Sequence, residues 1–215
     1  MLEFAFQDAV DHALDRLEAE LDPRLTYHSL DHTRNSVLPA AQRLGRLSCL
    51  SAESYHLLLT AAAYHDIGYL VQHEGHEAAG CEIVRETLPY FNYCPAQIEQ
   101  ICQIIMATRL PQTPRDLLGE LLADADLDVF GRNDLWEVMQ TLYCEMENFG
   151  KLPPLEAFKA GQWEFISGHR FFSDAARELR DASKQRNLMM LRQRFDDPST
   201  IYGRAALCEL RRAVR

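Results

Sequence analysis

The chain has 215 residues, of which 47% are hydrophobic and 25% are charged, and its formal net charge is −10. This composition is that of an ordinary globular protein, and the length allows one sizeable core or one domain with an extension. An acidic chain lacks the basic surface that tracks duplex nucleic acid, so we expect no nucleic-acid partner. A small anionic substrate is compatible with this charge, because one metal ion and a few local cations can reverse its sign inside a pocket.

The amino-terminal segment and the cysteines indicate the compartment. Residues 1–20 carry acids where a signal peptide needs bases. No apolar run approaches the ~20 residues that span a bilayer. The six cysteines form no Cys-x-x-Cys pair and lie in apolar segments, which is typical of buried free thiols in a reducing compartment. We therefore expect a cytoplasmic protein with no membrane partner.

Helical periodicity dominates the first part of the chain. Hydrophobic residues recur at steps of three and four within residues 6–21, which predicts a first amphipathic helix. A second helix should follow in the segment YHSLDHTRNSVLPAAQRLG, where Pro39 could kink it. A third, capped by Ser51, is apolar on nearly all sides and should be the central buried helix.

The later segments are also helical in pattern. The segment HEAAGCEIVRETL predicts a fourth helix, and Pro95 is placed to begin a fifth. The run RDLLGELLADADLDVFG predicts a helix that Gly131 stops, and Asn133 could cap the next one. The remainder predicts one or two long helices and a short terminal one. With no strand-like alternation, internal repeat or glycine-rich phosphate loop, the sequence predicts an all-α fold.

A group of histidines and aspartates is set within these apolar helices. His65 and Asp66 are adjacent at the end of the most buried predicted helix, where a charged aspartate is unfavourable unless it is paired or binds a metal. A His–Asp pair alone is more often a hydrogen-bonded core feature. However, His32 lies one helix earlier, and Asp124 and Asp126 lie in another apolar helix. Together these residues predict a divalent cation site, since imidazole and carboxylate suit Mn, Fe, Ni, Co, Zn or Mg.

The same residues resemble the signature of the HD superfamily, which is H…HD…D on separate helices of a bundle. The matching segments are YHSLDHTRNSV, AAYHDIGY and LLADADLDVFG, and the resemblance covers about residues 27–131. It is closest to the stand-alone bacterial proteins described as predicted metal-dependent HD phosphohydrolases. It implies an HD-domain helical bundle with a C-terminal helical extension. We expect one HD-type domain over residues 1–215, with its core at about 27–131 and residues 132–215 packed on it.

The resemblance also implies the metal ligands. We expect one ligand from each matching position: His32, His65, Asp66 and Asp126. His28 lies one turn before His32, but the family ligand is the histidine that leads into the apolar helix. Asp124 is the alternative to Asp126, because both aspartates follow an alanine. The apolar spacing ahead of Asp126 agrees better with the family, and we expect Asp124 to orient a ligand histidine.

Further residues receive substrate roles. Family members with two metals carry two more histidines; His76 resembles the first, but Thr108 and Arg109 stand where the second would fall. We therefore expect one divalent metal ion. His76 and His28 could then bind the phosphate or protonate the leaving oxygen. Asp66 could also steer the nucleophile, and Arg109 is a candidate phosphate contact.

Other polar residues are expected at the surface. Arg170 and Lys184 are further cations that could meet a phosphate, but a solvated surface position is the expectation for each. The same holds for His73, which belongs to a predicted loop.

These observations favour a metal-dependent phosphohydrolase that acts on a small phosphate ester, with a nucleotide as the leading candidate and with monoester and diester hydrolysis both open. The alternative is a non-catalytic HD-fold module that binds metal or nucleotide and signals to a partner, although a complete ligand set favours the enzyme. A two-iron oxygenase of the same fold is disfavoured by the missing histidine. The expected partner is a small phosphorylated substrate, and a homodimer stays open as the oligomeric state.

Overall fold

The chain folds as two compact helical units. The computed structural model describes residues 4–213, with side chains described as far as Cys208, and within these limits every regular element is a helix. The first unit takes the chain up to Asp22, then His28–Asp128 and Phe172–Ala176. The second takes Pro23–Tyr27, Val129–Phe171 and the chain from Arg177 onward. The predicted all-α class is confirmed, whereas the single domain with its extension packed on the core stays a prediction.

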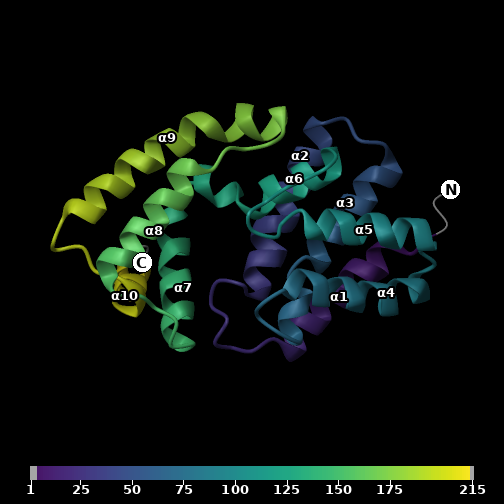
Figure 1. Ribbon diagram of the computed structural model, residues 1–215, viewed down its shortest axis with the longest axis horizontal. Helices are drawn as coiled ribbons and strands as arrows, with labels where there is room; N and C mark the ends of the chain where they lie inside the picture. Colours follow the sequence, from purple (N-terminus) through teal and green to yellow (C-terminus); the bar gives the residue numbers. More distant parts are fainter. Residues whose placement is uncertain (1–3, 214–215) are drawn as a thin grey trace. The chain divides into compact units, whose positions relative to one another are not determined.

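The first unit holds the residues that the sequence singles out. Its helices, labelled in Figure 1, are α1 (Phe6–Glu20), α2 (Leu38–Leu47), α3 (Ala52–Tyr64), α4 (His76–Thr87), α5 (Pro95–Met106) and α6 (Leu117–Asp126). Three short elements connect them: the π-helical turn η1 (His32–Val37) and the 3-10 turns η2 (Ile67–Leu70) and η3 (Leu88–Phe91). The predicted second helix thus begins as a π-helical turn that runs directly into α2, and Pro39, which has no N–H to donate, lies just after this turn.

Helix α3 is the centre of the first unit, as the sequence predicts. Every residue from Leu57 to Tyr64 is buried, and α3 packs against α1, α2, α5 and α6. The hydroxyl of Ser51 accepts a hydrogen bond from the backbone N–H of Ser54 at 3.1 Å, which caps the helix at its start. Because its neighbours surround it, the carboxyl end of α3 delivers the next two residues into the protein interior.

Two glycines let η2 and α4 approach closely. A Cβ at Gly68 would lie 1.8 Å from the carbonyl oxygen of His76 and 2.7 Å from the backbone nitrogen of Gly80. Real side chains do not come that close to a backbone, so this contact requires glycine at position 68. The close approach brings the first turn of α4, and with it His76, up to the end of α3.

The second unit contains α7 (Leu135–Asn148), α8 (Leu155–Gly168), α10 (Gly203–Ala213) and most of α9 (Asp174–Asp196). Two predictions made for this region are wrong. The cap of α7 is Asp134 rather than Asn133. Lys184 is buried rather than solvated, because its ammonium donates to the carbonyl of His169 and lies 3.3 Å from the Nδ1 of that ring. Burial lowers the pKa of Lys184.

The cysteines are free, but only half of them are buried. Cys81, Cys102 and Cys144 are inside as predicted, while Cys49, Cys94 and Cys208 are exposed. The expectation of six buried thiols is therefore wrong for those three. Cys94 is exposed because it caps the start of α5 at the surface instead of facing the core.

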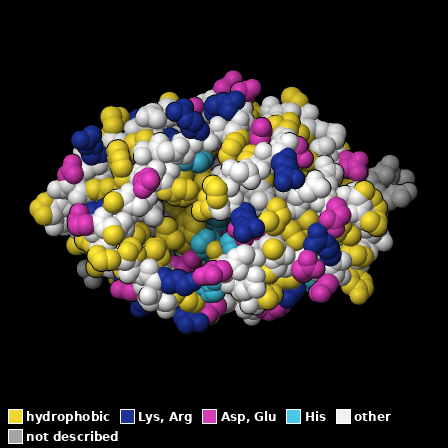
Figure 2. Space-filling view, in the orientation of Figure 1, with side chains coloured by type: hydrophobic (Ala, Val, Ile, Leu, Met, Phe, Trp, Pro, Cys, Tyr) yellow, Lys and Arg dark blue, Asp and Glu magenta, His cyan; other side chains and the backbone are white. Residues whose placement is uncertain are grey.

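The described surface shows mixed charge. On the face drawn in Figure 2, basic and acidic side chains are interspersed rather than gathered into one large patch of either sign. Among the described residues, no helix combines the length and the apolar character that crossing a membrane requires.

Candidate metal centre

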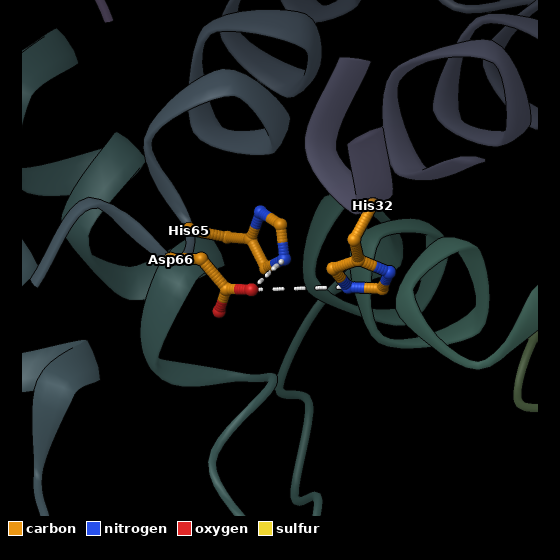
Figure 3. Close-up of side chains that lie close together, drawn as sticks. All are labelled: His32, His65 and Asp66. Carbon is orange, nitrogen blue, oxygen red and sulfur yellow. Dashed lines mark ion pairs between the residues drawn. The ribbon is translucent and has the colours of Figure 1, made fainter. Parts of the chain in front are cut away.

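The candidate metal ligands all come from the ends of helical elements in the first unit. His32 is the first residue of η1, and His65 directly follows the last residue of α3. Asp66 lies between α3 and η2, and Asp126 is the last residue of α6. Figure 3 shows His32 pointing toward the His65–Asp66 pair from a separate helical segment. Helix ends allow this convergence because the chain leaves the helical path there, so that the adjacent His65 and Asp66 can face one point.

The ligand atoms lie at the spacing of a metal coordination shell. The Nε2 of His32 is 3.1 Å from the Oδ1 of Asp126, and the Nε2 of His65 is 3.2 Å from the Oδ2 of Asp66. The cross distances are 3.7 Å from His65 to Asp126 and 3.8 Å from His32 to Asp66. Metal bonds of about 2.1 Å place neighbouring ligand atoms roughly 3–3.5 Å apart. The ligand atoms of His32, His65 and Asp66 all lie within 4.8 Å of one another, which fits a single divalent ion, and Asp126 lies beside both histidines.

The hydrogen bonding of His65 shows why a cation belongs there. Its Nδ1 is 2.9 Å from the carbonyl oxygen of Ala62, and a carbonyl can only accept, so Nδ1 carries the proton. In the neutral ring Nε2 is then a lone pair, and it faces the carboxylate oxygen of Asp66. Both atoms are buried and neither makes a hydrogen bond. Two acceptors 3.2 Å apart repel each other unless a proton or a metal ion lies between them.

The electrostatics of the pair lead to the same conclusion. Burial disfavours the charged ring of His65, but Asp66, Asp126 and the carbonyl of Ala62 together outweigh it and raise the pKa of His65 to about 9. Burial likewise disfavours the Asp66 carboxylate, and the neighbouring His65 nevertheless holds the pKa of Asp66 well below its usual range. At neutral pH the metal-free pair is therefore a buried ion pair with His65 protonated, and a metal ion bound there would displace that proton.

Asp124 and Asp126 have different surroundings. The Oδ1 of Asp124 accepts the backbone N–H of Phe172 at 2.8 Å, and its Oδ2 accepts the backbone N–H and the hydroxyl of Ser173 at 2.8 and 2.6 Å. The expectation that Asp124 orients a ligand histidine is therefore wrong, because its oxygens are used by this segment. Burial raises the pKa of Asp124 although these donors oppose the shift. The structure brings Asp126, and not Asp124, to the two histidines.

Comparison with protein families agrees with this geometry. A family model described as the HD domain matches residues 30–128. Residues 30–128 form an HD domain. The matched range contains His32, His65, Asp66 and Asp126, and the first and last of these lie close to its two ends. Searches of curated proteins and of solved structures found no match to the chain.

A group of stacked rings lines the cluster in the HD domain. The Nδ1 of His76 lies 3.2 Å from the carbonyl oxygen of His73, which leaves the Nε2 of His76 facing the Oδ1 of Asp66 at 3.4 Å. The ring of Tyr69 stacks on His76 at 4.0 Å and on His28 at 4.5 Å between centroids. The two predicted substrate histidines therefore share one aromatic neighbour. Sequence reasoning missed Tyr69, although its place three residues after Asp66 was a usable signal.

The predicted cations lie elsewhere. Arg109 is exposed and lines a surface cavity to which none of the cluster residues contributes, so its role in substrate binding stays a prediction. Arg170 and Lys184 belong to the second unit, outside the HD domain. His73, expected in a surface loop, is half-buried, and its ring packs edge-on against Tyr69.

Proposed function

We propose that the protein is a metal-dependent phosphohydrolase that acts on a small phosphate ester, with a nucleotide as the leading candidate. The observation that carries the proposal is the pair of buried acceptors, His65 Nε2 and Asp66 Oδ2, which face each other within an HD domain. Without a proton between them these two acceptors repel each other, and a cation bound by both would take the place of that proton. The net charge of −10 supports a small substrate recognised locally over a polyanion.

The proposed metal ligands have distinct roles. His32, His65, Asp66 and Asp126 would hold one divalent ion, whose identity among Mn, Fe, Ni, Co, Zn and Mg is open. When bound, such an ion polarises phosphorus–oxygen bonds and favours the deprotonated form of a bound water. The carbonyl of Ala62 keeps His65 in the tautomer that presents its lone pair to the ion. Asp66 would offer Oδ2 to the ion, since its Oδ1 faces His76.

The stacked rings of His76, Tyr69 and His28 are the proposed site of proton transfer. The carbonyl of His73 holds the proton of His76 on Nδ1, so Nε2 is the atom that can take up a proton and return it to the leaving oxygen. Tyr69 stacks on this ring and restricts its orientation. His28, on the same tyrosine, is the second candidate for contact with the phosphate.

The test begins with protein stripped of metal by a chelator and reloaded separately with Mn²⁺, Co²⁺, Ni²⁺ or Mg²⁺. Each form is assayed against p-nitrophenyl phosphate, bis-p-nitrophenyl phosphate and a set of nucleoside mono- and triphosphates. We expect hydrolysis by at least one reloaded form and none by Asp66→Asn treated in parallel. A protein that binds one metal per chain yet hydrolyses no phosphate ester would overturn the enzymatic proposal in favour of a binding and signalling module.

A further inference from the structure

Two buried cysteines meet where α4 and α5 lie side by side (Figure 1). The thiol of Cys81 donates to the carbonyl oxygen of Cys102 at 3.5 Å, and the thiol of Cys102 donates to the carbonyl oxygen of Cys81 at 3.7 Å. The contacts are reciprocal, so each sulfur reaches across to the main chain of the other residue. The two main chains are therefore close, and the two thiols are near enough to interact with each other.

The pair is buried but accessible from a cavity. Each cysteine is 3% exposed, and both line a cavity of about 690 Å³ between α4, α5 and the segment that follows α5. Its walls also include Ala78, Arg85 and Met106. This volume is in the range of small-molecule pockets, roughly 300–1,000 Å³, so a small reagent can reach the thiols without unfolding of the chain.

The surroundings distinguish the two thiols. The interaction between the two thiols lowers the pKa of Cys102 and raises the pKa of Cys81. Arg85 adds positive charge: it is held over the helix pair by Glu99 at 2.7 and 2.9 Å and by Glu82 at 2.8 Å. Its charge favours the thiolate form of Cys102. Cys102 is therefore the nucleophile of the pair and Cys81 the resolving thiol.

We propose that Cys81 and Cys102 form a reactive dithiol site that hydroperoxides oxidise to a disulfide between α4 and α5. The sulfur of Cys102 attacks one oxygen of hydrogen peroxide, forming a sulfenic acid and releasing one water. The sulfur of Cys81 then attacks the Cys102 sulfur, which forms the S–S bond and releases the sulfenic oxygen as a second water. Two thiols lose two electrons and two protons in total, and one peroxide is reduced to two waters.

The cross-link would join two helices that differ in their role at the cluster. Helix α4 begins with His76, five residues before Cys81, whereas α5 contributes no residue to the cluster. The cysteines are 21 positions apart, and closing a loop of that length restricts the unfolded chain. The proposal is independent of the proposed hydrolase activity, because it rests on the thiol pair and the cavity alone.

The full chain offers a direct mass-spectrometric test. Trypsin leaves Cys49 and Cys81 in one peptide and Cys94 and Cys102 in the next, so the variant Cys49→Ser/Cys94→Ser makes the linkage unambiguous. The reduced, folded variant is treated with stoichiometric hydrogen peroxide, alkylated under denaturing conditions and digested. We expect the two peptides joined through Cys81 and Cys102, with a loss of two mass units that dithiothreitol reverses.

Two further measurements separate the dithiol from ordinary buried thiols. Phenylarsine oxide, which bridges close thiol pairs, should bind one per chain in the same variant, and either Cys81→Ser or Cys102→Ser should abolish that binding. The oxidised variant should melt on the order of 5–10 °C higher than the reduced one.

Recovery of both cysteines as separate alkylated thiols, at a peroxide dose that oxidises the exposed Cys208, would overturn the proposal. So would oxidation of Cys102 to a sulfinic acid with Cys81 left free. Because the linkage is read in a chain that retains both cysteines, a folding defect in the serine variants leaves the test intact.

Discussion

Two carboxylates on one helix of the HD domain, the buried Asp124 and the half-buried Asp126, have opposite surroundings. Asp124 faces donors, since two backbone N–H groups and one hydroxyl point at its oxygens. Asp126 instead faces the two histidine rings, since the Nε2 atoms of His65 and His32 lie 3.7 and 3.1 Å from its Oδ1. Asp124 is therefore a structural anchor with all its donors present, and Asp126 belongs to the candidate metal site. The neighbours of a carboxylate thus distinguish a structural role from a functional one.

The Asp124 anchor and the His–Asp cluster also contribute differently to the stability of the fold. Hydrogen bonds to a charged group contribute about 1.5–3 kcal/mol each, so the Asp124 anchor stabilises the fold with or without a ligand. The His–Asp cluster instead brings acceptors together, and it stabilises the fold only when a proton or a metal ion lies between them. A ligand present at 100 times its dissociation constant adds about 2.7 kcal/mol to the free energy of unfolding. The following experiments test this contrast in order of expected effect.

The largest effect should come from removing the charge at position 126. Asp126→Asn is expected to lose the metal and to lower phosphoesterase activity by more than the roughly 10–100-fold that loss of an outer partner costs. Asp124→Asn is the matched control, two residues away on the same helix, and should keep about one metal per chain. Elemental analysis of both variants decides the matter. If Asp126→Asn keeps the metal and Asp124→Asn loses it, Asp124 is the ligand and Asp126 has the structural role.

The placement of the cluster depends on the contact between η2 and α4. In Gly68→Ala the new Cβ would meet the carbonyl of His76, a backbone atom that cannot turn aside, so α4 must shift. We expect a loss of about 3 kcal/mol in the free energy of unfolding, measured in urea. Gly161→Ala is the control, because no atom lies within 4 Å of the added carbon in α8. That variant should gain up to about 1 kcal/mol, and equal stabilities for the two would refute the tight contact.

Substitutions at the Asp124 anchor should lower the stability of the fold without changing metal binding. In Asp124→Asn the amide NH₂ must face a backbone N–H of the Phe172–Ser173 segment. This should lower the free energy of unfolding by about 2–3 kcal/mol. Ser173→Ala removes the hydroxyl contact to Asp124 at 2.6 Å and the acceptor of the Ala176 backbone N–H at 3.2 Å, and it should lower the free energy of unfolding by about 1–2 kcal/mol. Thermal unfolding followed by circular dichroism measures both. A marked drop in metal content in Ser173→Ala would show that the two regions are not separate.

The pH dependence of metal binding follows from His65. Because its pKa is raised to about 9 in the metal-free protein, the ring is charged at neutral pH and must release a proton to bind the ion. The apparent affinity for Mn²⁺ should rise about tenfold per pH unit and level off above pH 9. In the metal-free protein the sign is opposite: the stability due to the protonated ring is complete below pH ~6.5 and is lost as the pH rises through 9. Calorimetry in buffers of different ionisation enthalpy counts the released proton, and a pH-independent affinity would contradict the assignment.

The smallest effect concerns Tyr69. Tyr69→Leu removes the ring that stacks on His76 and His28, and kcat should fall about tenfold with metal content unchanged. Tyr69→Phe keeps the ring and should retain near-normal turnover. If the phenylalanine variant is as impaired as the leucine variant, the hydroxyl and not the stack is the important group.

Much of the fold could be predicted because its signals are local. The steps of three and four in residues 6–21 and the Ser51 cap act within one or two turns, and the structure has the corresponding helices. The apolar character of the segment before His65 likewise indicated that α3 would be central. A lysine long enough to reach the carbonyl of a distant residue, as Lys184 reaches His169, leaves no such local signal, so its burial was missed.

The sequence by itself determined the helices, the adjacency of His65 and Asp66 at the end of the buried helix α3, and the presence of Asp124 and Asp126 on α6. Only the tertiary structure decided which acid meets the histidines. Residues two apart on a helix point about 200° apart around its axis, so Asp124 and Asp126 face nearly opposite sides. Local sequence treats them alike, since both follow alanine in the same apolar run. Packing turns one side of α6 toward His32 and His65 and the other toward Phe172–Ser173, and the rotation of a helix is set by all its neighbours together.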